Sequence, residues 1–516
     1  GVDGGVWQYG DASAPAGRRT YFAGTTCKHP LVMAGVGAVL DHIMEHGESV
    51  YRALNAKMER LATTVNAWWA EKQLDLHIAN YGSQFKIVVA PNLATLFFQT
   101  LNLNGVYCWE GRTNFLYTTH TEEDVDGIIN ALKRTTLALL EHNVAVPTLE
   151  VAGDASLADD KQRKILEFAV SRGGSAAGSR VAQRGGALAL ANAGVAGPTL
   201  KAVKPYDTAQ TDLALVPALL DEYVRRHAAS RGYMSKSRIH LCDNRNISGF
   251  SPPYKDTIHP IVAKAGRGSH FTDLDDNDMI DIGGGFGPVL FGHNPPFVRD
   301  AVCKMFAEDR FVLGCEHEIV GEASRKFCEL TGNERVTWVN TGTEATTLAM
   351  RLCRLHTGRT KIVTFFGSYH GHFDGFLGIP QSLKTPDKCF PTAPGISRGF
   401  VSDLVMLEYD SAESLEWIDA HSKEIAGVYC ETIQNRNPKV VPTAFLQKLR
   451  HLTLERGIVL VFDEIVTGFR IGPGGAQQNL GIRADLVSYG KALGGGMPVG
   501  ALGGRAEIMA GVDGGV

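Results

Sequence analysis

The chain has 516 residues, 44% of them hydrophobic and 21% charged, with a formal net charge of −4 and a pI near 6.5. This length suits two or three domains, and the balanced charge lacks the basic excess typical of nucleic-acid-binding proteins. No apolar run approaches the ~18 residues that span a bilayer, and the first residues lack a signal-peptide pattern. The nine scattered cysteines form no Cys-x-x-Cys pair, which disfavours a disulfide framework and a zinc site. We therefore expect a cytoplasmic protein of enzyme size with no membrane, nucleic-acid or metal partner.

The first part of the chain, residues 1–148, predicts a compact α/β unit. It opens with the hexapeptide GVDGGV, which recurs at the other end as residues 511–516. Apolar spacing predicts a helix over residues 30–71, and short apolar runs predict strands over 85–89 and 96–98. Threonine and acidic residues from 119 to 126 predict the N-terminus of a last helix that ends near residue 143.

Composition changes over residues 149–216, where small and polar residues predict a flexible linker with at most a short amphipathic helix over 159–170. A helix resumes near residue 217, with proline in its first turn. Beyond residue 270, short β runs alternate with helical stretches, and this alternation predicts a mostly parallel sheet. We expect strands at 336–339, 361–365, 427–430, 458–462 and 486–488, and helices at 344–356 and 443–455.

Two residues at the ends of predicted strands carry the main chemical signal. Lys491 follows the strand at 486–488 and stands beside glycines, which let the backbone approach a ligand. Asp463 ends the apolar run at 457–462. A lysine so placed can form a Schiff base, and a carboxylate at another strand end can pair with the ring nitrogen of pyridoxal 5′-phosphate (PLP). Taken alone, however, a lysine in a glycine-rich loop is more often a solvated surface residue.

The sequence around these residues is more specific than either residue alone. Residues 463–470 read DEIVTGFR, and residues 491–496 read KALGGG. The pair resembles the signature of class III aminotransferases, a group that includes glutamate-1-semialdehyde aminomutase. The resemblance implies an α/β PLP-dependent transferase of fold type I, with a large domain on a mostly parallel sheet and a smaller α/β domain. It assigns Lys491 to the Schiff base and to proton transfer, and Asp463 to the pyridine nitrogen.

Residues 340–345 (NTGTEA) follow a predicted strand and open a predicted helix. Alone, this run suits an ordinary helix N-cap. Backbone N–H groups at a helix N-terminus also bind phosphate, and the resemblance places Gly342 and Thr343 on the cofactor phosphate.

Residues 366–372 (FGSYHGH) contain the Tyr-His-Gly run of the same family. The resemblance places Tyr369 on one face of the pyridine ring, with His370 beside it and Ile465 on the opposite face. A metal site at the His-x-His pair is not expected, since no carboxylate stands nearby at ligand spacing.

Residues 22–30 (FAGTTCKHP) resemble the Gly-Thr…Pro segment of the family. There the threonine reaches the cofactor phosphate of the neighbouring subunit. For Thr25 this implies a homodimer with a shared active site. Without the other motifs, Thr25 would be an ordinary turn residue before a helix.

Residues 431–436 (ETIQNR) depart from the family pattern of Glu-Pro followed by Gly-Asn. Glu431 is retained, but threonine replaces the proline, and Arg436 stands at the asparagine position. Arg436 suits an anionic group of the substrate, because a guanidinium matches a carboxylate or phosphate. A surface salt bridge is the alternative.

A glycine cluster at residues 283–287 (GGGFG) is by itself a weak sign of nucleotide binding. The residues around it, at 273–281 and 292–295, resemble the N-terminal region of class III aminotransferases. The resemblance makes the cluster a hairpin and a wall of the active site, and dinucleotide binding is not expected.

Two segments bear on the substrate. Residues 244–250 (NRNISGF) and 109–112 (WEGR) resemble aminotransferase domains of hybrid polyketide/non-ribosomal peptide synthetases. This implies amination of a β-ketoacyl thioester on an acyl-carrier domain, with glutamate or glutamine as donor and a β-amino acyl product. Ser248 and Arg112 thereby join Glu431 and Arg436 as candidate substrate residues.

Other functions remain open. One is a glutamate-1-semialdehyde-type aminomutase, although residues 251–255 (SPPYK) offer only a lysine where that enzyme has a carboxylate-binding arginine. Another is an aminotransferase for free ω-amino or keto acids. An inactive PLP-fold scaffold would be expected to lack Lys491 or Asp463, and both are present.

The order of motifs differs from that of the family. The Thr25 segment and residues 120–126 come last in class III aminotransferases, whereas here they come first. Joining the chain ends, with the repeated hexapeptide counted once, restores the order. This predicts a circular permutant, or one window of a tandem sequence. Residues 1–148 would hold the partner-threonine segment and small domain, 149–216 the linker, 217–300 the family's N-terminal segment and 301–516 the PLP-binding large domain.

Overall fold

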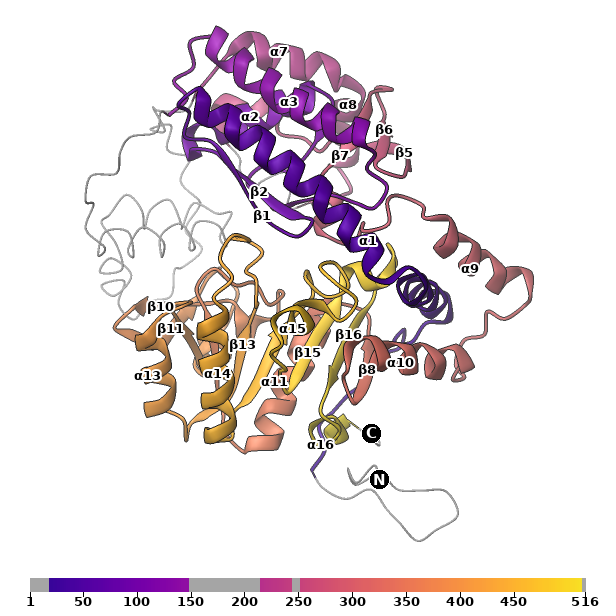
Figure 1. Ribbon diagram of the computed structural model, residues 1–516, viewed down its shortest axis with the longest axis vertical. Helices are drawn as coiled ribbons and strands as arrows, with labels where there is room; N and C mark the ends of the chain where they lie inside the picture. Colours follow the sequence, from indigo (N-terminus) through magenta and orange to yellow (C-terminus); the bar gives the residue numbers. More distant parts are fainter. Residues whose placement is uncertain (1–17, 148–213, 244–250, 513–516) are drawn as a thin grey trace.

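The computed structural model describes residues 18–147, 214–243 and 251–512, which form two units in Figure 1. The lower unit in that view contains most of the second half of the chain. The upper unit combines indigo elements from the start of the chain with magenta and rose elements that follow residue 214. The predicted linker over 149–216 falls outside the described residues except at 214–216, and so does the helix predicted over 159–170.

A seven-stranded sheet forms the centre of the lower unit, in the order β12-β9-β13-β14-β15-β16-β8. The neighbours from β12 to β15 pair in parallel, whereas β16 runs antiparallel between β15 and β8. The mostly parallel sheet and its five predicted strands are therefore confirmed. The strands are β8 (Arg335–Val339), β9 (Lys361–Phe365), β12 (Leu404–Leu407), β13 (Ile425–Cys430), β14 (Val459–Asp463), β15 (Leu486–Gly490) and β16 (Gly500–Gly504).

Helices cover this sheet, and the strands of its centre are buried along their whole length. Strands covered on both faces read as continuous apolar runs, which is why they could be found in the sequence. The helices are α11 (Gly342–Thr357), α12 (Arg398–Val401), α13 (Ala412–Ala420), α14 (Thr443–Arg456), α15 (Gly475–Leu480) and α16 (Ala506–Met509). A hairpin of β10 (Gly378–Ser382) and β11 (Thr385–Pro391) packs near β12.

The upper unit holds two small sheets. One is antiparallel and consists of β1 (His77–Tyr81), β2 (Gln84–Val88) and β4 (Asn114–Phe115). The other has the order β3-β7-β6-β5, with β3 (Val106–Tyr107), β7 (Asp278–Asp281), β6 (His270–Asp273) and β5 (Ala263–Arg267). Because β3 pairs in parallel with β7, two segments far apart in the chain share one sheet.

The helices of this unit agree with the sequence except at one place. α3 (Glu122–Glu141) begins at a capping box of Thr121 and Asp124. In the second described segment, which starts at residue 214, the helices are α7 (Pro217–Arg226) and α8 (Ala228–Ser237). Residues 96–98, which we predicted as a strand, lie inside α2 (Pro91–Leu103). Its buried residues recur at helical spacing after an N-terminal proline, whereas a short apolar run alone does not distinguish a helix from a strand.

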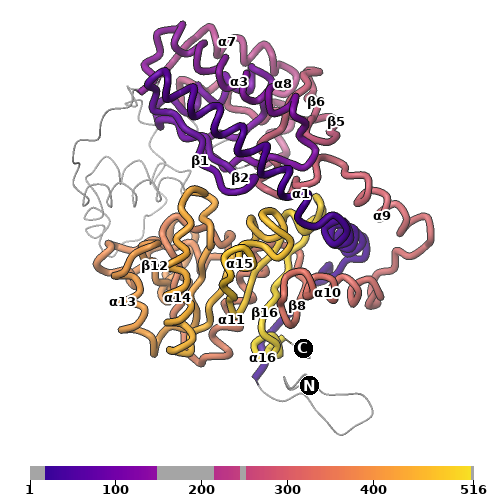
Figure 2. The backbone as a smooth tube through the Cα atoms, in the orientation of Figure 1, coloured from indigo at the N-terminus to yellow at the C-terminus, as the bar shows by residue number. Residues whose placement is uncertain are grey.

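One long helix, α1 (Pro30–Glu71), connects the two units and has the predicted bounds. Its direction changes at Gly47, which has φ 48° and ψ −138° (Figure 2). The part before the kink packs on α9 (Pro296–Ala307) and α10 (Glu318–Thr331), and the part after it packs on α3 and β1. Neither α1 nor any other helix in the described part of the chain has the apolar length needed to cross a membrane.

The segment before α1 lies along the end of the lower unit. Thr20 N donates a hydrogen bond to Gly511 O at 2.9 Å, and Arg351 Nη1 donates to Tyr21 O at 3.0 Å. The first and last described segments of the chain are therefore neighbours in space.

Candidate active site

Lys491 and Asp463 lie at the same edge of the central sheet. β14 ends at Asp463, and its parallel neighbour β15 ends at Gly490, directly before Lys491. Asp463 is in register with Ser488, so β15 extends two residues beyond the end of β14 before it reaches Lys491. Ligands of open α/β sheets bind outside the carboxyl ends of the strands, which makes this edge the expected place for a site.

Lys491 has an unusual backbone conformation and a perturbed amine. Its φ is 49°, a left-handed value that is rare for residues other than glycine and often marks a functional position. Burial lowers the pKa of the amine to about 8, although Asp463 and Glu431 act in the opposite direction. Near neutral pH, far more of the nucleophilic, uncharged amine is therefore present than in an ordinary lysine.

The glycine-rich turn forms a wall beside this lysine. It contains the short helix η3 (Gly284–Phe286), and Gly287 follows with φ 115°. A Cβ at Gly287 would lie 3.1 Å from Lys491 Cδ, closer than most real contacts of this kind. Glycine at this position therefore lets the turn pack directly on the lysine side chain.

Asp463 is buried and already has two partners. His370 Nδ1 lies 2.7 Å from Asp463 Oδ2, and Ile465 N donates to Oδ1 at 3.1 Å. His370 is also buried and packs against the rings of Phe376 and Tyr429. A carboxylate has about four acceptor sites, so Asp463 keeps the capacity to accept from a further donor, such as a ring N–H.

The N-terminus of α11 lies close to Ile465. Thr341 caps the helix by accepting a hydrogen bond from Glu344 N at 3.2 Å. The N–H groups of Gly342 and Thr343 have no acceptor within the helix, and such groups bind phosphate well. A Cβ at Gly342 would lie 2.7 Å from Ile465 Cδ1, so only glycine leaves both residues in place.

By their chemistry, these groups fit PLP. Lys491 supplies an amine that loses its proton easily, Asp463 supplies a carboxylate with spare acceptor capacity, and α11 supplies N–H groups for a phosphate. Gly342 leaves no room for a side chain at this N-terminus, because a Cβ there would collide with Ile465. The structure brings these predicted residues to one edge of the sheet, while their individual roles stay predictions.

Electrostatic interactions connect the candidate substrate residues Glu431, Arg436 and Arg112. Glu431 is buried and within electrostatic reach of both Lys491 and Arg436. Arg436 is in turn within reach of Arg112 and Tyr369. The side chain of Tyr369 is open to a ligand, since 47% of its surface is exposed.

Two predicted site residues stand apart from this group. Thr25 is exposed, and none of the described contacts joins it to the residues above. Its neighbour Thr26 donates to Asn340 Oδ1 of the same chain at 3.1 Å, just before α11. Contact of Thr25 with a partner subunit therefore stays a prediction. Ser248 falls outside the described residues.

Arg470 shapes the site, although the sequence did not single it out. It is fully buried, its guanidinium lies 4.6 Å from the Phe115 ring, and it also lowers the pKa of Lys491. It donates to four oxygens of three segments: Ser83 Oγ, Leu116 O, Gly287 O and Val289 O, at 3.3, 3.2, 2.9 and 3.2 Å. The available signal was its place at the end of the DEIVTGFR run, where an apolar context suggests a buried charge.

A histidine and two aspartates of the upper unit, His227, Asp273 and Asp275, are close enough together to hold a metal ion. The carboxylate oxygens of both aspartates already accept hydrogen bonds from backbone N–H groups. Asp275 accepts hydrogen bonds from Ala229 N and Ser230 N at the start of α8, at 2.6 and 3.1 Å. His227 Nδ1 lies 3.1 Å from Asp273 Oδ2. We regard this cluster as structural.

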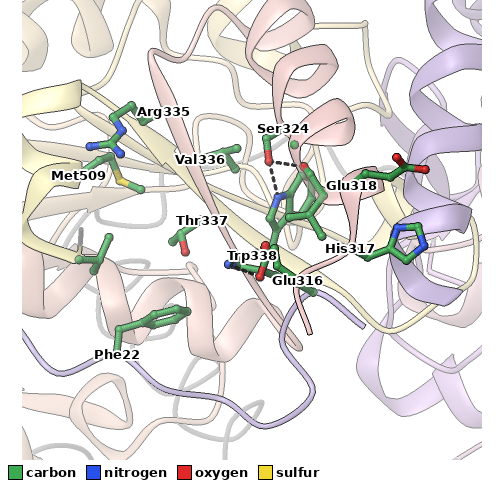
Figure 3. Close-up of a pocket in the computed structure, with 14 residues that line it drawn as sticks. Phe22, Glu316, His317, Glu318, Ser324, Arg335, Val336, Thr337, Trp338 and Met509 are labelled. Atoms are coloured by element: carbon green, nitrogen blue, oxygen red, sulfur yellow. Dashed lines mark hydrogen bonds and ion pairs between the residues drawn. The ribbon is translucent and has the colours of Figure 1, made fainter. Parts of the chain in front are cut away.

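A cavity of about 770 Å³ lies away from the predicted active-site residues, between β8, α10 and the segment before α1 (Figure 3). Trp338 and Ser324 line it and are joined by a hydrogen bond of 2.8 Å from Nε1 to Oγ. None of the predicted site residues lines this cavity. The volume of this cavity is therefore no evidence that it takes part in the chemistry of the predicted PLP site.

Comparison with known proteins agrees with the PLP site that the geometry suggests. The family model for class-III aminotransferases matches residues 250–515, just over half of the chain. The chain is 38% identical over 257 residues to the glutamate-1-semialdehyde 2,1-aminomutase of Clostridium tetani, and 41% identical over 254 residues to that of Salinibacter ruber. These matches cover 49% and 48% of the chain but only 60% and 57% of the relatives.

Solved structures show the same fold. A glutamate-1-semialdehyde-aminomutase from Pseudomonas aeruginosa PAO1 superposes with a TM-score of 0.50 and 24% identity, covering 57% of this chain and 64% of that one. A second structure of that enzyme is a complex with PMP. The chain belongs to the class-III aminotransferases, a family of PLP-dependent enzymes of fold type I.

Proposed function

We propose that this chain catalyses PLP-dependent amino-group transfer on a small amino or keto acid, in the manner of the glutamate-1-semialdehyde 2,1-aminomutases that it resembles. The observation that carries the proposal is the pair of Lys491 and Asp463 at the carboxyl ends of adjacent parallel strands. The names of the relatives support movement of an amino group between carbons 2 and 1 of one molecule. They favour this chemistry over the carrier-bound substrate expected from the sequence.

In this proposal the protein supplies the group that attaches the cofactor and the group that transfers the proton. When bound, PLP would act as the electron sink for the substrate carbanion. Lys491 Nζ would hold the cofactor at rest and, once free of it, would take and return the proton at the substrate carbon that bears nitrogen. Its lowered pKa suits both tasks near neutral pH. Asp463 keeps the ring nitrogen protonated.

The remaining predicted residues would fix the position of the cofactor. The N–H groups of Gly342 and Thr343 would hold its phosphate, and Tyr369 and Ile465 would hold its ring. His370 would hold Asp463 in one orientation through their 2.7 Å contact.

The assembly is part of the proposal. Residues 18–147 supply β3 and all three strands of the small antiparallel sheet to the unit that also contains residues 263–281. This packing and the Thr20 contact with Gly511 support the view that the chain is a permuted form of the family, with the domain limits given above. Thr25 would then act in the active site of a partner subunit within a homodimer. Intact mass and N-terminal sequencing would establish the covalent order.

A β-ketoacyl group on an acyl-carrier domain, aminated from glutamate or glutamine, remains the second candidate substrate. The observation in its favour is that Lys255, which stands where the aminomutase has an arginine, is exposed and makes none of the described hydrogen bonds. A carboxylate would therefore need another anchor in this chain.

Absorption spectroscopy of the PLP-loaded protein tests the proposal. We expect a visible absorption band that shifts on addition of an amine donor, with glutamate, glutamine and glutamate-1-semialdehyde tried separately. A Lys491→Ala variant serves as the control and should show no such band. A wild-type protein without a band, or with a band that no amine shifts, would overturn the proposal and favour the inactive scaffold.

A further inference from the structure

The loops that follow two neighbouring strands of the central sheet are joined through one side chain. The loop after β9, residues 366–372, contains Tyr369 and His370, and the loop after β13 covers residues 431–437. Because β13 pairs in parallel with β9, both loops leave the sheet at its carboxyl edge, where the candidate active site lies. Gln434 of the second loop is buried, and its amide reaches the first loop.

Gln434 holds the first loop by two hydrogen bonds. Its Nε2 donates to Phe366 O at 2.6 Å and to Ser368 Oγ at 3.2 Å. Gly367, between these two residues, has φ 86°, and a Cβ there would lie 2.7 Å from Gln434 Oε1. Glycine at this position therefore lets the amide approach the loop closely. The second of the bonded residues, Ser368, directly precedes Tyr369.

The bonded part of the first loop leads directly into two predicted cofactor residues. Tyr369 is half exposed and is predicted to stack on the cofactor ring. His370 follows it, and its Nδ1 lies 2.7 Å from Oδ2 of Asp463. Because Gln434 holds the residues just before this pair, it limits the positions that the two side chains can take.

The second loop is itself fixed on both sides of Gln434. Asn435 N donates to Glu431 Oε2 at 3.3 Å, and Asn437 N donates to Gln434 O at 2.9 Å. Thr113, which lies in the upper unit, donates from Oγ1 to Asn435 O. A shift of the upper unit against the central sheet would therefore act on the neighbour of Gln434, and through Gln434 on the first loop.

We propose that Gln434 is a positioning residue for Tyr369 and His370, and that it links their place at the cofactor to the position of the upper unit. The inference rests on the proposed function for the roles of Tyr369 and His370, whereas the hydrogen bonds of Gln434 do not depend on it. It also gives a task to a residue of the segment 431–436, whose sequence departs from the family pattern.

Hydrogen–deuterium exchange of the apoprotein tests the positioning without the cofactor. In Gln434→Met we expect the amides of residues 366–372 to exchange about tenfold faster than in the wild type, because two hydrogen bonds are lost. Gln434→Glu has nearly the same shape, but its carboxylate cannot donate, so exchange should also be faster at about pH 8. At about pH 5 a protonated carboxyl group can donate to Phe366 O, and part of the difference from the wild type at the same pH should disappear.

Circular dichroism of the visible band of the PLP-loaded protein tests the effect on the cofactor. Gln434→Met should weaken this band, and kcat for amino transfer should fall about tenfold with little change in KM. Thr113→Val removes the bond from the upper unit and should cause a smaller change in the same direction. The double variant should lose less than the two single losses added together, since both act through the same loop.

Controls separate this inference from a folding defect and from the proposed function. Gln99→Met removes an amide that donates to Thr257 Oγ1 at 2.7 Å in the upper unit, and it should change neither exchange at 366–372 nor the band. Thermal unfolding shows whether each variant is folded, and if Gln434→Met is not, Gln434→Glu at the two pH values decides the question.

Unchanged exchange at residues 366–372 in the Gln434 variants would overturn the positioning role. Faster exchange with an unchanged band would overturn the link to the cofactor. A wild-type protein whose band no amine shifts would instead overturn the proposed function, and the exchange experiment on the apoprotein would still decide whether Gln434 holds the loop.

Discussion

His370 Nδ1 lies 2.7 Å from Asp463 Oδ2, and both side chains are buried. The histidine is thus the main side-chain partner of the carboxylate that is proposed to face the cofactor ring. A buried carboxylate that loses such a donor is less stable in its charged form. The contact links the Tyr-His-Gly run to the end of β14.

His370→Phe should therefore weaken catalysis without removing the cofactor lysine. We expect kcat/KM for amino transfer to fall about tenfold to a hundredfold, which corresponds to the ~1–3 kcal/mol cost of leaving a buried polar group without its partner. His370→Asn keeps a donor near Nδ1 and should recover part of the loss. Equal activity of the phenylalanine variant and the wild type would contradict the role given to this contact.

Gly342→Ala should loosen the cofactor site. The added Cβ would lie 2.7 Å from Ile465 Cδ1, so Ile465 must move from its predicted place on the cofactor ring. We expect PLP to bind about tenfold more weakly, as judged by fluorescence titration of the apoprotein. Gly232→Ala is the control, because a Cβ at that exposed helical position meets nothing within 4 Å. It should leave PLP affinity unchanged, and a similar loss in both variants would speak against the Ile465 contact.

Arg470 should tune Lys491 through the glycine-rich wall. Arg470 Nη2 donates to Gly287 O at 2.9 Å, and Gly287 packs on the Lys491 side chain. Burial sets the lowered pKa of Lys491, and the positive charge of Arg470 lowers it further. In Arg470→Met we expect the pKa of Lys491 to rise, whereas in Arg470→Lys it should stay near the wild-type value.

The measurement is the pH dependence of lysine labelling in the apoprotein, followed by mass spectrometry of the Lys491 peptide. Labelling of the wild type should have its midpoint near pH 8, because only the uncharged amine reacts. A midpoint in Arg470→Met at or below that of the wild type would refute the electrostatic coupling. Thermal unfolding of both variants shows whether they remain folded.

Glu431 should make binding of an anionic ligand depend on pH. Burial raises the pKa of its carboxyl group to about 8, so the group becomes negative only above that pH. The carboxylate then neutralises Arg436 and competes with the ligand. Glutarate affinity should fall as the pH rises through about 8 in the wild type, and it should fall much less in Glu431→Gln. An identical decline in both proteins would show that Glu431 does not cause the pH dependence of glutarate binding.

His270 links two distant segments and should make stability depend on pH. Its Nε2 lies 2.8 Å from Asp124 Oδ1, and its Nδ1 lies 2.8 Å from Asp278 Oδ2. Burial lowers the pKa of His270, but the hydrogen bonds to both aspartates outweigh it and raise the pKa above 6.5. Because the folded state then has the higher pKa, this stabilisation is complete below pH 6.5 and is lost as pH rises through the folded value.

His270→Asn should accordingly lower the free energy of unfolding more at about pH 6 than at about pH 9. The loss should be at most about 1 kcal/mol, because the histidine is partly exposed. His451→Asn removes an exposed histidine that pairs with Glu455 within α14, and it should have little effect at either pH. Denaturant unfolding at the two pH values makes the comparison, and a loss that is greater at the higher pH would reverse the assigned sign.

The sequence was most informative where one short segment determines both structure and chemistry. Lys491 and Asp463 could be placed because buried parallel strands are continuous apolar runs, and because the residues that follow them meet at one edge of the sheet. The bounds of α1 were predicted from apolar spacing, and the start of α3 from the threonine and acidic residues that precede it.

Contacts between distant segments could not be read in this way. Residues 96–98 are as apolar as a strand, and only their packing within α2 shows that they are helical. The contact of Gly287 with Lys491, and that of Lys86 with Arg436, join segments whose approach depends on how the two units pack. No local pattern marks such a pair, so the approach of Lys86 to Arg436 could be found only in the structure.

The central claim is that Lys491 is the residue to which the cofactor is bonded. Borohydride reduction of the PLP-loaded protein traps the cofactor on its lysine, and peptide mass spectrometry then identifies the position. We expect a single modified lysine, Lys491, and no modification at this peptide in Lys491→Ala. A label on another lysine, or a reduced protein with no label, would contradict the assignment.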